Sequence, residues 1–514
     1  MTQSELARAV RDVLAVDTDE FRAEAATDAD FVLSALADGA FDNHQSFLGL
    51  EYEFYAVTDD RWHSEADEEF ALARVPRRLL ELIGFEKELG LHNAEMTASP
   101  QPFNHHGLRA IESEVCSRLT AALDCSRPEG LRLVSDALWT IPPTGETARG
   151  YLTDSVDDDG IRIATNMTDA VRYHAMANAA LGDDSFRVDA PHVDIEAETL
   201  MPESLITSIQ PHYQMQQAMD LPRYFTYALR VAGPLLALGV NAPFFPPDLY
   251  EADADPEVIL ADGWHENRIA VFESVLNSAT ETDKVAFPRD LDSIEQAVER
   301  VVADETVVPM PVDRTDRYHD NFATLRRKHG TYWRWVRPVF DGPTRAAANA
   351  RIEFRPLPAQ PTVRDSMALT AAFAGAMEGL TRTEHPVSGL SWTAARDNFY
   401  AAVRDGIDAD MRWILADGTE TGDIELLLTD LLEHAAEGLR AVGLPPEAVD
   451  SYLQPLSWRV ETELTPAAWK RQAVRAELDD GALFAEAIER MQRRYIDRQS
   501  ETIIGGDFTA WPDP

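Results

Sequence analysis

Cysteines, basic side chains and long apolar runs are all scarce in this sequence of 514 residues. The two cysteines, Cys116 and Cys125, match no metal-binding spacing and indicate a reducing compartment rather than a disulfide-stapled secreted protein. The longest apolar run, at 231–240, is too short to cross a bilayer and contains Pro234. The N-terminus has no basic segment followed by an apolar run. We therefore expect a cytoplasmic protein without a signal peptide.

Positive charge is the most marked shortage. The chain has 46 Lys and Arg against 89 Asp and Glu, which gives a formal net charge of −43. Such a charge argues against nucleic acid or an anionic membrane as the partner. The acidic residues are spread along the chain and do not form a single tail. This pattern is typical of a halophilic protein, because molar salt shortens the Debye length to about 3 Å and screens the self-repulsion.

What is present includes a short stretch, 351–355, in which charged and apolar residues alternate. Side chains alternate between the two faces of a β-strand, so Arg351, Glu353 and Arg355 share one face of the predicted strand. A carboxylate between two guanidinium groups suits a nucleoside triphosphate with its Mg²⁺. The alternative is a solvated edge strand that carries a ladder of charges.

A second predicted strand, at 49–57, places Glu51 and Glu53 on one face and apolar residues on the other. Two carboxylates at this spacing repel each other unless a cation lies between them, and Mg²⁺ or Mn²⁺ prefers such oxygen ligands. In a chain with 89 acidic residues the pair can also arise by chance, as it does at 196–198 and 461–463. The apolar partner face and the preceding glycine distinguish this copy.

Three further predicted strands add candidate site residues. The strand at 92–100 carries Glu95, which joins the first carboxylate pair if the two strands lie side by side. The strand at 208–215 places His212 between two glutamines on one face. The alternative for His212 is a hydrogen-bonded histidine in a mixed interior. The strand at 332–338 carries Arg337 near its end.

The domain organisation follows from a change of pattern along the chain. Residues 1–46 indicate a helical lead-in, and 47–388 hold every candidate site residue. The last region, 389–514, has helical spacing throughout and no catalytic constellation, so we expect it to pack on the core. Its predicted helices span 392–415, 423–442, 446–453 and 465–495.

Six motifs, taken together and in order, resemble those of the glutamate–cysteine ligase superfamily, the carboxylate–amine ligases related in fold to glutamine synthetase. They are G-x-E-x-E-F at 49–54, E-x-T-x-x-P at 95–100, the His-bearing strand at 210–214, P-L-L-A-L-x-x-N-A-P-F at 234–244, W-x-x-x-R-P at 333–338 and E-F-R at 353–355. The resemblance covers about residues 45–385.

The resemblance implies an α+β fold like that of glutamine synthetase, in which a mostly antiparallel sheet forms a funnel flanked by helices. It also implies roles for individual residues. The expected ligands of Mg²⁺, or Mn²⁺, are Glu51, Glu53, Glu95, His212 and Glu353. The expected catalytic residues are Glu353 and Arg355. The expected contacts to ATP and substrate are Arg355, Arg337 and Asn241.

The implied activity is ATP-dependent amide formation through an acyl phosphate, with glutamate and cysteine joined into γ-glutamylcysteine. Two alternatives stay open. One is the same ligase chemistry on another amino acid or amine. The other is a catalytically silent protein that binds a nucleotide. In each case the expected partners are small molecules, and the sequence does not define an oligomeric state.

Overall fold

The computed structural model of the chain describes residues 1–59, 70–179, 185–251, 254–278 and 280–511. Its centre is an eight-stranded sheet in which every neighbouring pair is antiparallel. Six strands lie in the order β11 (Val336–Asp341), β12 (Asn349–Phe354), β10 (Ile209–Gln214), β1 (Phe47–Thr58), β4 (Asn93–Pro102) and β3 (Phe85–Lys87). Two more, β2 (Leu72–Ala73) and β5 (Leu131–Val134), pair with β1.

The alternation seen in the sequence divides the two faces of this sheet. Ile352 and Phe354 are fully buried, and the ring of Phe354 stacks on Phe373 of α12 (Val363–Arg382) at a centroid distance of 4.2 Å. Thr362 starts this helix, because its side chain accepts a hydrogen bond from the backbone N–H of Asp365. The apolar face therefore packs on helices, and the charged face is left for the site.

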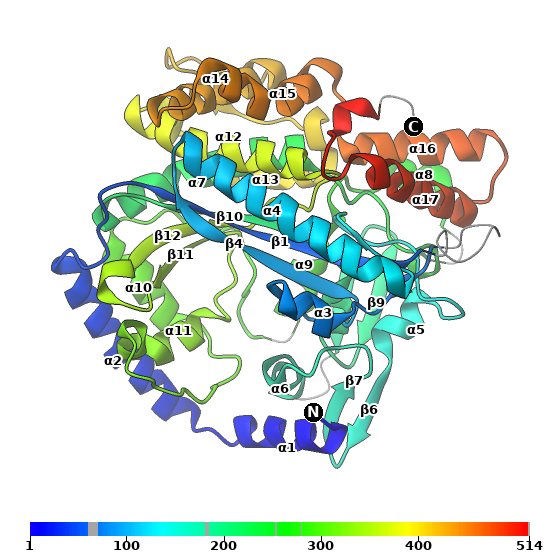
Figure 1. Cartoon of the computed structure of the whole chain (residues 1–514), viewed down its shortest axis with the longest axis horizontal. Coiled ribbons are helices and arrows are strands. Elements are labelled where there is room, and N and C mark those ends of the chain that lie inside the picture. The colour runs from blue at the N-terminus through cyan, green and yellow to red at the C-terminus, as the bar shows by residue number, and fades with distance from the viewer. Residues whose placement is uncertain (60–69, 180–184, 252–253, 279, 512–514) are drawn as a thin grey trace.

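Helices cover the sheet in layers (Figure 1). With α12, α4 (His105–Ser126) and α7 (Leu221–Gly239) cover the apolar face. The N-terminal α1 (Gln3–Leu14) and α2 (Thr18–Ala37) run along the opposite side of the molecule. The other helices before the C-terminal region are α3 (Arg77–Leu82), α5 (Ala148–Thr153), α6 (Val171–Ala179), α8 (Pro256–Asp262), α9 (Asn267–Asn277), α10 (Ile294–Ala303) and α11 (Ala323–His329). Three two-stranded hairpins lie outside the sheet: β6 (Ser155–Asp158) with β7 (Ile161–Ala164), β8 (Phe186–Ala190) with β9 (Val193–Ala197), and β13 (Trp413–Ile414) with β14 (Glu420–Thr421).

The C-terminal region is helical, and part of it packs on α12, the helix that covers the apolar face of the sheet (Figure 1). Its helices are α13 (Trp392–Asp405), α14 (Ile424–Ala441), α15 (Pro446–Thr462), α16 (Pro466–Asp479) and α17 (Phe484–Thr502). The prediction of an α+β protein with a mostly antiparallel sheet, flanking helices and a helical C-terminal region is confirmed. The domain boundaries at 46 and 388 stay a prediction.

Four predicted elements were wrong in their extent. The helix expected over 446–453 continues to Thr462, with Pro455 inside it. The helix expected over 392–415 ends at Asp405, where Gly406 takes a positive φ of 58°. The helix expected over 465–495 is two helices that meet at Gly481, which has a φ of 91°. The strand expected from 332 begins only at Val336, because the residues before it lie outside the ladder with β12. Among the described residues, no helix is both long enough and apolar enough to span a bilayer.

Candidate active site

Five adjacent strands bring most of the expected site residues to one face of the sheet. Across β10 and β12, His212 lies opposite Glu353, and across β11 and β12, Arg337 lies opposite the same Glu353. Across β1 and β4, Glu53 lies opposite Glu95. The β1–β4 register shifts between Leu48 and Leu50, which is the mark of a β-bulge at the glycine that precedes Glu51.

Glu51, His212 and Glu353 form the centre of this face, which we call the carboxylate cluster. One ligand atom from each lies within 4.8 Å of the other two. The Nε2 atom of His212 is 3.1 Å from Glu51 Oε1 and, within the described parts of the chain, makes no hydrogen bond. His212 Nδ1 accepts a hydrogen bond from Arg351 Nε at 3.1 Å, so Nε2 carries the ring proton here and would have to release it to bind a metal. The two carboxylates suit a divalent cation, and the imidazole completes the donor set once it is deprotonated at Nε2. The residues present therefore fit Mg²⁺ or Mn²⁺.

Arginines balance the charge of the carboxylate cluster. Glu353 Oε1 lies 2.8 Å from Arg337 Nη2 and 2.5 Å from Arg355 Nη1. Burial acts to raise the pKa of Glu353, but these two guanidinium groups outweigh it and hold the pKa well below its usual range. The Nε atoms of both arginines are buried and, among the described residues, unpartnered. Each can therefore donate to an anionic ligand.

Glu53 and Glu95 form a second part of the same face. Glu53 accepts hydrogen bonds from the backbone N–H of Ser208 (2.6 Å) and from Gln210 Nε2 (2.9 Å). Burial, with the nearby charge of Glu88, raises the pKa of Glu53 to about 7. Burial also raises the pKa of Glu95 well above its usual value, and the carboxylates around it add to the shift. Like charges held together in this way indicate a place for a cation.

The structure adds residues that the sequence analysis missed. Glu88 and Glu203 interact electrostatically with Glu53, and burial raises the pKa of Glu203 to about 8. Arg268 of α9 is buried beside them and donates from Nη2 to the carbonyl of Arg355 at 3.3 Å. In the sequence these are single charges in a loop, a short helical turn and a helix. No local pattern distinguishes them from solvated surface charges.

Asn241 does not lie where the sequence analysis expected it. It is fully buried, and its side chain donates to the carbonyl of Ala359 (2.8 Å) and to the hydroxyl of Tyr495 (3.2 Å). Its backbone N–H donates to Glu266, whose carboxylate lies 3.5 Å from Arg268. Asn241 therefore supports Glu266, the neighbour of the site residue Arg268, and is absent from the lining of both cavities described below.

Cavities lie on both sides of the carboxylate cluster. One, of about 390 Å³, is lined by the cluster itself with Arg337 and Arg351. Another, of about 20 Å³, is lined by Glu53, Arg268 and Arg355 among others. The first has the usual size of a small-molecule site, whereas the second has room for about one water molecule.

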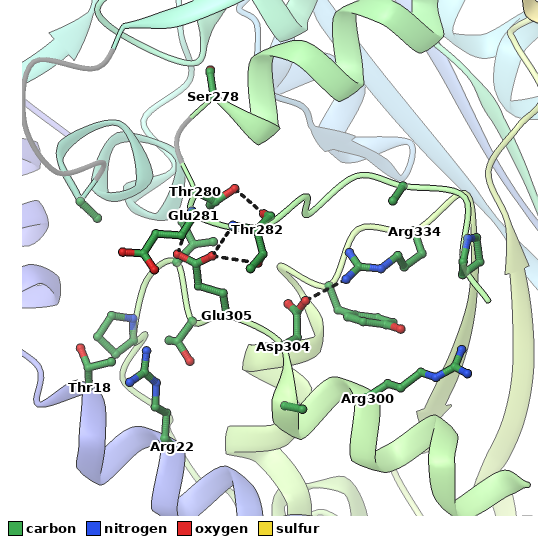
Figure 2. A pocket seen from close by; sticks show the side chains of 18 of the residues that line it. Thr18, Arg22, Ser278, Thr280, Glu281, Thr282, Arg300, Asp304, Glu305 and Arg334 are labelled. Atoms are coloured by element: carbon green, nitrogen blue, oxygen red, sulfur yellow. Dashed lines mark hydrogen bonds and ion pairs between the residues drawn. The ribbon is translucent and has the colours of Figure 1, made fainter. Parts of the chain in front are cut away.

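A larger cavity, of about 1300 Å³, has a different lining (Figure 2). Figure 2 shows Asp304 pointing toward Arg334, and Glu305 pointing toward the segment around Thr282. None of the expected site residues lines it. Because Asp304 and Glu305 are engaged with neighbours and the expected site residues lie elsewhere, we place the chemistry at the carboxylate cluster.

The family model described as glutamate–cysteine ligase family 2 (GCS2) matches residues 47–501. Among curated proteins, none matches. Solved structures that match include a glutamate–cysteine ligase from Francisella tularensis in complex with AMP, with 13% identity, a TM-score of 0.44 and coverage of 90% of this chain and 91% of that one. A bifunctional glutathione synthetase from Pasteurella multocida has 14% identity and a TM-score of 0.47, and the match covers 92% of this chain and 55% of that one. The ligase PafA in complex with the ubiquitin-like protein Pup has 10% identity, a TM-score of 0.38 and coverage of 87% and 71%. At TM-scores below 0.5, these three likenesses do not bear on function.

Proposed function

This chain belongs to glutamate–cysteine ligase family 2, and we propose that it joins glutamate to cysteine, forming γ-glutamylcysteine with the hydrolysis of ATP. Membership makes it an ATP-dependent carboxylate–amine ligase. The observation that supports the site is the convergence of Glu51, His212 and Glu353 with two arginines on one face of the sheet. The pair of substrates rests on the family alone.

The reaction requires neutralisation of charge on the phosphoryl groups more than it requires a protein nucleophile. A carboxylate is a poor electrophile, so the γ-phosphoryl group of ATP is transferred to it, which gives an acyl phosphate and ADP. The amine then attacks the acyl carbon and loses a proton. The bond between that carbon and the phosphate oxygen breaks, and inorganic phosphate leaves with the bonding electrons. Both transfers place negative charge on phosphoryl oxygens, and catalysis consists mainly of positioning and stabilising that charge.

We assign the residues to this chemistry by their positions. Glu51, His212 and Glu353 would hold one Mg²⁺, and Glu53 and Glu95 would hold another on the adjacent part of the face. When bound, Mg²⁺ neutralises charge on the phosphate oxygens.

Arg355 and Arg337 are held in place by Glu353, and their unpartnered Nε atoms are available to phosphoryl oxygens. We place the nucleotide in the cavity of about 390 Å³. The amino-acid carboxylate lies on the side of Arg268, where the small cavity must open to admit it.

The proposal is tested by measuring ADP release for purified protein with ATP, Mg²⁺ and a panel of amino acids in high-salt buffer. We expect turnover only when an acid and an amine are both present, and the highest rate with glutamate plus cysteine. Glu353→Gln is the control, because it removes the carboxylate that both arginines contact. A higher rate with another amine would overturn the substrate assignment but not the ligase chemistry. Nucleotide binding without turnover on any pair would favour the silent nucleotide-binding protein.

We further propose that the protein works in a cytoplasm of high salt, as its charge of −43 suggests.

A further inference from the structure

A second group of metal-ligating side chains lies far along the chain from the active site, where the end of α12 meets α14. It consists of His385, Asp430 and His434, which we call the histidine cluster. His385 follows α12 and precedes a short 3-10 turn, and the other two residues lie one turn apart on α14. One ligand atom from each lies within 4.8 Å of the other two. All three side chains are at least about nine-tenths buried, with exposures of 1%, 11% and 11%.

The histidine cluster is held in place by hydrogen bonds from outside it. Trp413 Nε1 donates to Asp430 Oδ2 at 2.7 Å, and the backbone N–H of Ala416 reaches Oδ1 at 3.3 Å. His434 Nδ1 lies 2.8 Å from the backbone carbonyl of Asp430, so this nitrogen carries the proton and Nε2 keeps its lone pair. A histidine oriented through its other nitrogen in this way is typical of a metal ligand.

His385 provides the observation that points to a ligand. Its Nε2 atom is fully buried, and within the described residues it makes no hydrogen bond, although Asp430 Oδ2 is 3.1 Å away. The distance is short enough for a hydrogen bond, so the alignment is what fails. The contact is close but poorly aligned, so an ion between the imidazole and the carboxylate would satisfy both groups better than they satisfy each other.

We propose that the histidine cluster binds a transition-metal ion of the Zn²⁺ class. Two imidazoles and one carboxylate form the donor set that Zn²⁺ takes in three-ligand sites, with water in the fourth position. Imidazole nitrogens favour Zn²⁺, Co²⁺ or Ni²⁺ over Mg²⁺, which prefers oxygen ligands, so the two clusters of this protein select different metals.

Binding of the metal costs one hydrogen bond next to His385, which gives the proposal a specific structural consequence. His385 Nδ1 now accepts a hydrogen bond of 3.2 Å from the backbone N–H of Val387. In that tautomer the ring proton is on Nε2. When the metal binds to Nε2, the ring proton must move to Nδ1, and the bond to Val387 is lost. The metal therefore replaces a capping interaction at the turn that follows α12.

The consequence of occupancy is structural. The metal joins the end of α12, which lies against the sheet through Phe373, to α14 in the C-terminal region. It therefore cross-links the C-terminal helices to the helix that supports the catalytic strand β12. We expect it to stabilise the fold and to take no part in the ligase reaction.

The experiment is a titration of the metal-free full-length protein with Co²⁺ in buffer that contains excess Mg²⁺. Mg²⁺ fills the oxygen-rich carboxylate cluster, and Co²⁺ reports four-coordinate binding by its intense visible absorption. We expect one equivalent of Co²⁺ to bind to the parent protein, and Zn²⁺ to displace it. The same equivalent of Zn²⁺ should raise Tm by about 2 °C or more.

His434→Gln and His385→Gln should each abolish the visible band and the shift in Tm. His106→Gln, at an exposed histidine outside the cluster, should change neither. Circular dichroism of each metal-free variant shows whether it has folded. Two variants are made so that the test still holds if one of them does not fold. The proposal is overturned if the parent binds no Co²⁺ under these conditions, or if both folded cluster variants bind it as the parent does. Because ADP release is measured separately, failure here leaves the ligase proposal untouched.

Discussion

The charged face of the sheet and the seam between the C-terminal helices and the core both bury charge, but they do so in opposite ways. At the seam, Lys470 of α16 donates to Asp136 and to the carbonyl of Asn241, and Arg459 of α15 donates to Asp365 at 2.7 Å. All four charged side chains are at most 2% exposed, and each cation faces one carboxylate. On the sheet, carboxylates crowd around Glu95, and within the described residues His212 Nε2 is left without a hydrogen-bond partner.

This difference distinguishes a structural role from a functional one. A buried ion pair in which one cation meets one carboxylate holds two elements in register. Crowded carboxylates with raised pKa values cost stability unless a bound cation offsets the repulsion. We therefore expect substitutions at the seam to act on folding and substitutions on the sheet to act on turnover.

The largest expected effect is at the seam. Lys470→Met leaves Asp136 as a buried, unpaired carboxylate, and we expect the free energy of unfolding to fall by about 3–5 kcal/mol. Denaturant unfolding in high-salt buffer measures it. Lys87→Met, at an exposed lysine, is the matched control and should cost less than about 1 kcal/mol. Adding Asp136→Asn to the first variant should recover part of the loss. A Lys470→Met protein as stable as the control would show that the pair is not structural.

Arg355→Lys is the corresponding test on the sheet. Lysine keeps the charge but loses the planar fork, so we expect turnover to fall by roughly 10²–10³-fold, as for the loss of one preorganised transition-state donor. Nucleotide affinity and unfolding should change far less, because the side chain faces the site. Steady-state ADP release beside nucleotide binding measures both, with Arg345→Lys at an exposed position as the control. Turnover like that of the parent would remove Arg355 from the mechanism.

Glu266 links the two regions and provides a pH test. Burial raises the pKa of Glu266 to about 7, against an ordinary value of 4.5. Below pH 4.5 the carboxyl group is protonated in both states. As the pH rises toward 7, only the unfolded state ionises, so stability is lost up to pH 7 and then levels off.

Glu266→Gln should remove this slope, which amounts to about 1–3 kcal/mol between pH 4.5 and 7. Unfolding curves at several pH values measure it, with the exposed Glu299→Gln as the control. Parallel pH profiles for the parent and Glu266→Gln would contradict the assignment.

Counted per charged residue, the smallest expected effect is that of salt concentration on the acidic surface. With a net charge of −43, lowering the ionic strength should lower Tm, because the acidic surface is then unscreened. Thermal unfolding from molar salt down to low salt measures this. A Tm that is independent of salt would contradict the halophilic interpretation. The buried pairs of the seam should contribute little to the change, since salt screens buried charges weakly.

Strand periodicity predicted correctly that the charges of 353 and 355 share a face. The period of two placed Glu353 and Arg355 on one face, and the structure has them 2.5 Å apart. The suggestion that Glu95 joins Glu53 needed only the pairing of β1 with β4, and the two residues are direct neighbours across it. Their roles as metal ligands stay a prediction.

Other parts of the site were beyond prediction because they depend on contacts between distant segments. Arg268 and Glu203 are ordinary charges in the sequence, and only the packing of α9 and a short turn against β10 and β12 brings them to Glu53. Asn241 lies in a recognisable motif, yet its side chain is engaged by Ala359 and by Tyr495 of the last long helix. A motif identifies a segment, but it does not say which way one side chain of that segment points.

By itself, the sequence determined the elements that depend on neighbouring residues: the strands, through their period of two, most of the helices, and the acidic surface, through composition alone. The tertiary structure decided which charged side chains are paired and which side chains keep an unpartnered atom that can bind a ligand. That property depends on residues such as Asp136 and Lys470, which are 334 positions apart and become partners only in the folded chain. The histidine cluster has the same origin, because His385 meets Asp430 only where two helices pack together. Local periodicity is set over a few residues, whereas the balance of buried charge is set by the whole fold.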